Sequence, residues 1–240
     1  MNLLAISDLH LNPASEQRTG MFLRFLSRSL ESGDEIVIVG DLFDLWFGKH
    51  PFEYQKSVLE RMKELSAQGL ALHYVEGNRD FGIGHLAGTL FRDVWSEAFE
   101  LKWFGRSLYL VHGDLINTKD IPYRFWRALT KNALSLRLLD ALPASFLLKR
   151  SSHLEQQMRT TNLKNKSRYP EEECSHFCMQ QFQRGADLII AGHFHAEIEK
   201  SVQIDGRNVL FYNLPGWEQG FRYLVIPPGK EKPYFQGLEN

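Results

Sequence analysis

The sequence predicts an α/β fold, and three features of its pattern support this prediction. Short apolar runs alternate with amphipathic stretches through the first half of the chain, as in βα units that feed a sheet with covered faces. Polar residues follow directly on several of these runs. The composition, with 43% hydrophobic and 24% charged residues, excludes a disordered or fibrous chain. The length of 240 residues suits one domain, 1–240, that carries an insertion.

The first half of the chain contains four apolar runs of strand length, at residues 3–7, 35–39, 70–75 and 108–111. Between the first two runs, apolar residues recur at helical spacing and stop before Gly33, which is a natural C-terminal cap. A second helix is expected over residues 54–66. These elements predict a sheet that alternates with helices.

The last third of the chain starts with one more helix and strand and then changes to hairpins. An acidic first turn at Glu171 predicts a helix that extends to Arg184, and residues 187–191 form the next buried strand. From residue 198 to residue 226 the pattern is typical of hairpins, with a tight turn at 204–207.

Residues 120–169 interrupt the α/β pattern. They contain no strand-like run but several helix-period segments rich in Leu, Phe and Trp, which predicts a helical insertion. Ten basic and three acidic side chains give this segment a charge of +7, although the whole chain has a net charge of -1. One face of the protein is therefore expected to be basic and partly apolar.

Several function classes are excluded or disfavoured by the rest of the sequence. The sequence contains no run of eighteen uncharged apolar residues, which is about the length that a membrane-spanning helix needs. The first residues lack the basic and small-residue features of a secretory signal, so a cytoplasmic protein is expected. Cys174 and Cys178 are the only cysteines, which excludes a disulfide framework.

Polar motifs follow five of the predicted strands. In chain order they are Asp8-Leu9-His10, Gly40-Asp41, Gly77-Asn78-Arg79-Asp80, His112-Gly113-Asp114 and Gly192-His193-Phe194-His195. The carboxyl ends of strands in an open α/β sheet are where ligands bind, so these side chains are expected to converge. Two carboxylates, four imidazoles and one amide oxygen suit a divalent ion such as Mn, Fe, Zn or Co.

The spacing of these motifs predicts two ions. Residues i and i+2 of an extended segment point the same way, so Asp8 with His10, and His193 with His195, are each expected to direct two ligands to one point. Asp41 has two oxygens and can bridge ions roughly 3.5 to 4 Å apart. Each motif alone is also ordinary turn chemistry, but their joint occurrence indicates a dinuclear hydrolase.

The motif series resembles the calcineurin-like metallophosphoesterase superfamily. Within that superfamily it is similar to the UDP-2,3-diacylglucosamine diphosphatases of lipid A biosynthesis. The narrower similarity is carried by residues 7–11, 40–46, 77–81 and 112–114, and by Asp120 and Tyr123 ahead of the basic insertion. The resemblance implies a four-layer αββα sandwich and a site for two divalent ions, with Mn²⁺ expected.

The resemblance also implies roles for individual residues. One metal would be held by Asp8, His10, Asp41 and His195, and the other by Asp41, Asn78, His112 and His193. Asn78, Arg79 and Asp80 would be catalytic, where Asp80 is either an acid–base group or a residue that orients a ligand. An arginine at position 79 suits a bidentate phosphate clamp. The substrate would contact Asn78, Arg79, Asp120, Tyr123, Thr161, Asn165 and Arg168.

The implied reaction cleaves the diphosphate of a nucleotide-activated acylated sugar, UDP-2,3-diacylglucosamine, into UMP and 2,3-diacylglucosamine 1-phosphate. The insertion would then line an acyl pocket and contact the inner membrane peripherally, although its leucines also suit simple packing between helices. The sequence departs from the family form at Phe194, Ala196-Glu197 and Lys49-His50, which bears on substrate identity.

Three alternatives remain open at this point. One is a related metallophosphoesterase acting on another nucleotide diphosphate or phosphodiester. Another is a binding module that has lost catalysis, against which the full ligand set argues. The third is a nuclease, which the even net charge disfavours, so no nucleic-acid partner is expected. No obligate protein partner is evident.

Overall fold

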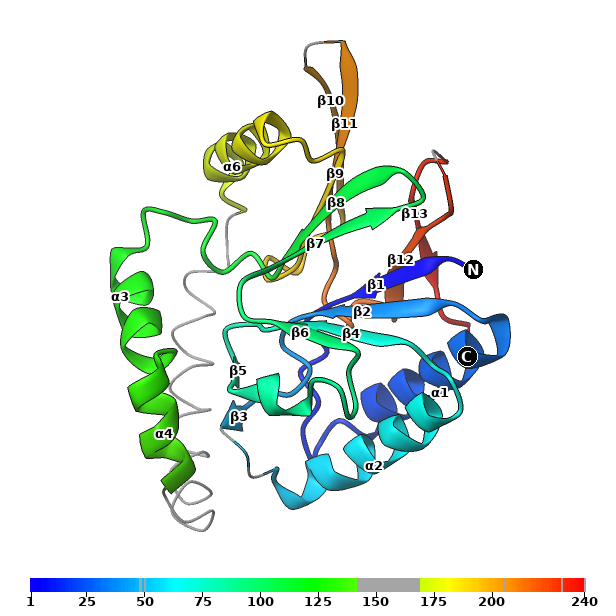
Figure 1. Ribbon diagram of the computed structural model, residues 1–240, viewed down its shortest axis with the longest axis vertical. Coiled ribbons are helices and arrows are strands. Elements are labelled where there is room, and N and C mark those ends of the chain that lie inside the picture. Colours follow the sequence, from blue (N-terminus) through cyan, green and yellow to red (C-terminus); the bar gives the residue numbers. More distant parts are fainter. Residues whose placement is uncertain (48, 50, 142–168, 205, 230, 240) are drawn as a thin grey trace.

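The computed structural model describes residues 1–240 except 48, 50, 142–168, 205, 230 and 240. Two β-sheets pack face to face, and helices cover the outer face of each sheet, so the chain forms four layers (Figure 1). This architecture confirms the predicted α/β fold and the αββα sandwich.

The first sheet has six strands. In spatial order they are β13 (Tyr234–Gly237), β12 (Arg222–Ile226), β1 (Leu3–Ile6), β2 (Glu35–Val39), β4 (Leu72–Val75) and β6 (Asp93–Trp95). β1, β2, β4 and β6 are parallel; at one edge β12 is antiparallel to β1, and β13 is antiparallel to β12. The carboxyl ends of four strands therefore lie at one side of the sheet.

The second sheet has five strands. In spatial order they are β10 (Ile198–Ile204), β11 (Arg207–Asn213), β9 (Leu188–Ala191), β8 (Arg106–Val111) and β7 (Ala98–Trp103). β11, β9 and β8 are parallel, whereas β10 and β7 are antiparallel to their neighbours. The predicted strand at 108–111 thus belongs to a different sheet from the three predicted before it. A separate short parallel pair joins β3 (Trp46–Phe47) to β5 (Asp80–Phe81).

Helices close the two outer faces. α1 (Glu16–Ser32) and α2 (Glu53–Ala67) pack on the first sheet, and α6 (Glu171–Gln183) packs on the second. A 3₁₀ turn covers Ile83–Leu86. α1 ends where predicted, because Gly33 adopts φ 69° and its N–H donates to the carbonyl of Leu30. Side chains of both sheets interdigitate between the sheets, among them Leu3, Val37, Leu110, Ile190 and Tyr212.

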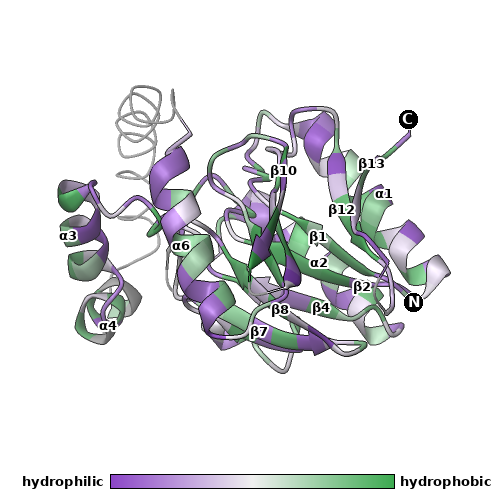
Figure 2. Ribbon diagram, turned by 90° about the horizontal axis from the view of Figure 1, so that it is seen from above, coloured by the Kyte–Doolittle hydropathy of each residue, from purple (hydrophilic) through white to green (hydrophobic). Residues whose placement is uncertain are grey.

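The first part of the predicted insertion is helical. α3 (Ile121–Thr130) and α4 (Ala133–Ala141) stand apart from the outer helices, on the side toward which β1 and β2 run (Figure 1). Both strongly hydrophobic and strongly hydrophilic residues occur along α3 (Figure 2). Thr161, Asn165 and Arg168 lie outside the described residues, so their predicted role stays a prediction. Among the helices of the described chain, none is long and apolar enough to cross a bilayer.

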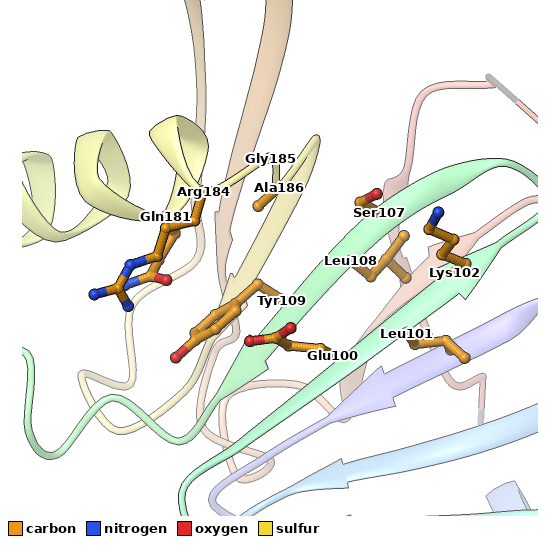
Figure 3. A pocket seen from close by; sticks show the side chains of 10 residues that line it. All are labelled: Glu100, Leu101, Lys102, Ser107, Leu108, Tyr109, Gln181, Arg184, Gly185 and Ala186. Carbon is orange, nitrogen blue, oxygen red and sulfur yellow. The ribbon is translucent and has the colours of Figure 1, made fainter.

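A pocket of about 370 Å³ lies on the second sheet, between the β7–β8 hairpin and the end of α6. Glu100, Tyr109 and Arg184 are among its lining side chains (Figure 3). None of the predicted site residues lines it. The predicted chemistry is therefore located elsewhere, at the strand ends.

Candidate metal centre

One group of predicted ligands forms at the carboxyl ends of β1 and β9. The His195 Nε2 atom lies 2.9 Å from the Asp8 Oδ1 atom and 3.2 Å from the His10 Nε2 atom. The His10 Nε2 atom is 3.6 Å from the Asp8 Oδ1 atom. Two imidazole nitrogens and a carboxylate oxygen thus face one point, which we call the first ligand group.

A second ligand group forms between the two sheets. The Asn78 Oδ1 atom lies 3.0 Å from the His112 Nε2 atom and 3.1 Å from the His193 Nδ1 atom. Asp41 stands between the groups. Its Oδ1 atom is 3.6 Å from the His112 Nε2 atom, and its Oδ2 atom is 3.9 Å from the His10 Nε2 atom. One carboxylate therefore turns an oxygen toward each group, and its predicted role as a metal bridge stays a prediction.

Left-handed backbone conformations set the directions in which these side chains point. Seven non-glycine residues of the described chain have a positive φ, and five of them are predicted ligands, namely Asp8, His10, Asp41, His193 and His195. Such residues are uncommon and cluster at functional sites, because the surrounding fold must hold the strain. The prediction that extended i and i+2 positions aim His193 and His195 at one point was wrong. The two histidines divide between the ligand groups.

Glycines allow the strand ends to approach one another. A Cβ atom at Gly77 would lie 2.5 Å from the backbone nitrogen of Asp41, and one at Gly192 would lie 2.7 Å from the Ser7 Oγ atom. Real Cβ atoms do not come this close to other heavy atoms. The motifs that contain these glycines therefore pack backbone against backbone around the carboxylates.

The site keeps its carboxylates charged although they are fully buried. Burial opposes the charge on Asp8, but the His195 ring and hydrogen bonds with His10 and His195 hold the pKa of Asp8 well below its usual range. Burial also opposes the charge on Asp41, and the nearby His112 and His10 rings hold the pKa of Asp41 below its usual value. The site is thus prepared for positive charge.

The residues fit divalent metal ions on two further observations. The Oδ2 atom of Asp41 is buried and accepts no hydrogen bond, and the Arg79 Nε atom is 3.8 Å away, so this ionised oxygen keeps lone pairs for a metal ion. The His112 Nδ1 atom lies 2.9 Å from the Val39 carbonyl oxygen, which fixes the ring so that Nε2 faces the Asn78 Oδ1 atom at 3.0 Å. An imidazole nitrogen and an amide oxygen at this separation are suited to hold one cation together.

Comparison with known proteins agrees with this geometry. A family model described as calcineurin-like phosphoesterase matches residues 1–197. The chain belongs to this family. The UDP-2,3-diacylglucosamine hydrolase of Stenotrophomonas maltophilia (strain K279a) is 33% identical over 230 residues, which are 92% of this chain and 93% of that protein. The protein of the same name from Yersinia enterocolitica is 28% identical over 207 residues, with 85% and 86% coverage.

A solved structure has a similar fold. The solved structure of an archaeal phosphodiesterase superposes with a TM-score of 0.50, over 99% of this chain and 100% of that one, at 11% identity. As a calcineurin-like phosphoesterase, the protein is a metal-dependent hydrolase, and its clustered His and Asp side chains are of the type that holds divalent metals.

Asp80, in this calcineurin-like phosphoesterase, contacts the backbone of Asp41. Its Oδ2 atom accepts hydrogen bonds from the Asp41 N–H at 2.5 Å and from the Tyr74 hydroxyl at 2.6 Å. Burial, together with the negative charge of Asp41, raises the pKa of Asp80 to about 7. Of the two predicted roles, these contacts favour the one that orients a ligand.

Arg79 lies inside the site with 5% of its surface exposed. Its backbone N–H donates to the Asp41 Oδ1 atom at 2.9 Å, and its guanidinium donates to the Asp44 carbonyl at 3.3 Å. The buried Nε atom, 3.8 Å from the Asp41 Oδ2 atom, has no hydrogen-bond partner. An oxygen of a bound phosphate is the acceptor that this donor lacks.

The two remaining described substrate candidates, Asp120 and Tyr123, also have local contacts. The Asp120 side chain caps α3 by accepting from the backbone N–H of Tyr123 at 3.1 Å. The Tyr123 hydroxyl donates to the Asp114 Oδ2 atom at 2.5 Å. Both residues therefore position the start of the insertion beside the His112 loop, and their contact with substrate stays a prediction.

Several neighbours of the site carried no strong signal in the sequence. The Asp44 Oδ1 atom lies 3.5 Å from the His10 Nδ1 atom, and its Oδ2 atom accepts from the Asn12 amide at 2.7 Å. Asp44 is part of the quoted 40–46 motif, so that motif was the available signal. Lys131 and Arg127 have no such motif, and only their spacing of four on a helix marks one shared face.

Proposed function

We propose that the protein hydrolyses the diphosphate of UDP-2,3-diacylglucosamine to UMP and 2,3-diacylglucosamine 1-phosphate, with two divalent ions, Mn²⁺ being the expected metal. The proposal is supported by relatives of that name that match nearly the whole chain. The observation that carries it is the position of Arg79, whose Nε–H has no hydrogen-bond partner and lies 3.8 Å from the Asp41 carboxylate, so a phosphate bound there would adjoin the metal site.

Each group of site residues has a separate role in the proposed reaction. When bound, the two ions would polarise phosphoryl oxygens and lower the pKa of water toward neutrality. Asp8, His10, Asp41 and His195 would hold one ion, and Asp41, Asn78, His112 and His193 the other. Arg79 binds the phosphate charge of the substrate and orients it for in-line attack. Asp80 keeps the Asp41 backbone in place through the 2.5 Å hydrogen bond.

The insertion supplies the surface for an acylated substrate. Four large apolar side chains of α3 are exposed, namely Ile121, Phe125, Trp126 and Leu129. The same helix contacts the His112–Asp114 loop through Tyr123 and Arg127. We propose that this apolar face receives acyl chains, and that the basic charge of residues 120–169 draws the protein to anionic lipid of the inner membrane.

Release of UMP from diacylated and deacylated substrate tests the proposal. With Mn²⁺ present, UDP-2,3-diacylglucosamine should turn over much faster than UDP-glucosamine, because acyl burial contributes about 0.8 kcal/mol per CH₂. Equal turnover of the two would favour the alternative, a phosphoesterase that acts on another nucleotide diphosphate or phosphodiester.

A pair of variants localises the acyl contact. Phe125→Ser removes an exposed ring of α3, whereas Phe104→Ser removes an exposed ring from the β7–β8 turn, away from the site. Phe125→Ser should raise KM for the diacylated substrate and leave turnover of the deacylated one unchanged. Phe104→Ser should change neither value. An equal effect of both variants would contradict an acyl site on α3.

A further inference from the structure

Helix α3 reaches the loop that follows β8 through the half-buried Arg127. The Arg127 Nε–H donates to the Asp114 Oδ2 atom at 2.8 Å, and its other guanidinium arm donates to the Ser96 carbonyl at 3.4 Å. The two charged side chains are only 11% and 3% exposed. Asp114 is two residues beyond His112, a ligand of the second group.

The same helix ends on the loop that follows β4. Lys131, the residue after the last turn of α3, donates from its Nζ atom to the Gly77 carbonyl. The Nζ atom also lies 3.7 Å from the Glu76 Oε2 atom, and the Lys131 side chain is 8% exposed. Gly77 directly precedes Asn78, which supplies the amide oxygen of the second group.

The two contacts connect different sheets. β4 belongs to the first sheet and β8 to the second, so Asn78 and His112 reach the second ligand group from opposite layers. Arg127 and Lys131 are four residues apart and therefore lie on one face of the helix end. This face joins both loops, while the apolar residues of α3 remain exposed.

We propose that Arg127 and Lys131 are positioning residues for the second ion, so that the insertion is part of the metal centre's support as well as a substrate surface. The inference rests on the two-ion centre of the proposed function. Removal of one partner of a largely buried ion pair leaves the other charge uncompensated, so the loops that hold Asp114 and Glu76 are expected to move when either cation is removed. Substitution of residues that support metal ligands through hydrogen bonds commonly lowers the affinity for the metal by about 10- to 100-fold.

Titration of the metal-free protein with Mn²⁺ alone tests this inference. We expect the parent to bind two ions, and Arg127→Gln and Lys131→Met to weaken one of them by about 10- to 100-fold while the other is retained. The weakened ion should be the one that His193→Ala also weakens, and not the one that His10→Ala weakens. At limiting Mn²⁺, the electron paramagnetic resonance spectrum should accordingly show a coupled pair of ions in the parent and a single ion in Arg127→Gln and Lys131→Met.

Conservative and matched variants separate positioning from charge and from folding. Lys131→Arg and Arg127→Lys keep the charge and should recover most of the lost affinity. Arg137→Gln removes one charge from an exposed position on α4 and should keep both affinities. Circular dichroism and thermal unfolding check that each variant is folded.

The outcomes that overturn the inference are distinct from those that overturn the proposed function. Unchanged binding of both ions in Arg127→Gln and Lys131→Met, or equal weakening of both ions, would refute positioning of the second ion alone. A parent that binds fewer than two Mn²⁺ would refute the two-ion centre, and the inference with it.

Discussion

Substitution of Gly77 by alanine should damage both stability and metal binding, because no room exists for its side chain. The added Cβ atom would lie 2.5 Å from the backbone nitrogen and 3.0 Å from the Cγ atom of Asp41. These are atoms of a fully buried residue that is itself fixed by Asp80 and Arg79, so they cannot move cheaply. Overpacking of this kind costs about 1–3 kcal/mol.

The cost converts into measurable changes. For a chain of this length, about 1–3 kcal/mol corresponds to a Tm lower by roughly 2–12 °C. The metal-free protein should show this shift in thermal unfolding, since the clash does not depend on metal. Displacement of Asp41 should also weaken Mn²⁺ binding in a titration, because that carboxylate turns one oxygen to each ligand group.

Gly20→Ala is the matched control for Gly77→Ala. Gly20 is an exposed residue of α1, and a Cβ atom there would meet nothing within 4 Å. Alanine is favoured over glycine in a helix by about 1 kcal/mol, so the same chemical change should raise the Tm by roughly 2–4 °C. A Gly77→Ala protein with the parent's Tm and Mn²⁺ affinity would refute the close approach of the two loops.

Three further substitutions test single contacts of the site. Asp41→Asn should reduce Mn²⁺-dependent turnover by several orders of magnitude, and near-normal turnover without metal would contradict a bridging carboxylate. Arg79→Gln should lower kcat/KM by about 10- to 100-fold, because charged hydrogen bonds to phosphate are lost. Its metal content should equal that of the parent, and a loss of metal that matches the loss of activity would argue against a phosphate clamp. Tyr74→Phe should destabilise the protein by about 1–3 kcal/mol in denaturant unfolding, because Asp80 loses its 2.6 Å donor, and an unchanged midpoint would show that this hydrogen bond contributes nothing.

Local signals were sufficient for much of the fold. The helix that ends at Gly33 and the strand at 35–39 were predictable because capping and apolar periodicity act over a few residues. The edge strands β6, β7 and β13 were not predicted. They are short and only partly buried, so their residues carry little periodicity of their own, and their pairing with β4, β8 and β12 is seen only in the assembled sheets.

The candidate site, like the fold, was predictable from the sequence only in part. The types of the predicted ligands and their place after strands are properties of the sequence, because strand ends are marked by glycine and polar motifs. The family resemblance implied a division of His193 and His195 between two metals, whereas their spacing predicted one common point; the structure shows the backbone behind the division, which is left-handed at both residues. A positive φ at a non-glycine residue is imposed by surrounding packing and leaves no local signal.

The sequence by itself determined the α/β class, the helical character of the residues that form α3 and α4, and the ligand chemistry of the site. Only the tertiary structure decided which sheet each strand joins, and that Arg127 and Lys131 reach Asp114 and Gly77. Such contacts span up to 54 positions of the chain. They are selected by the packing of two sheets against one helix, and no window of neighbouring residues encodes that packing.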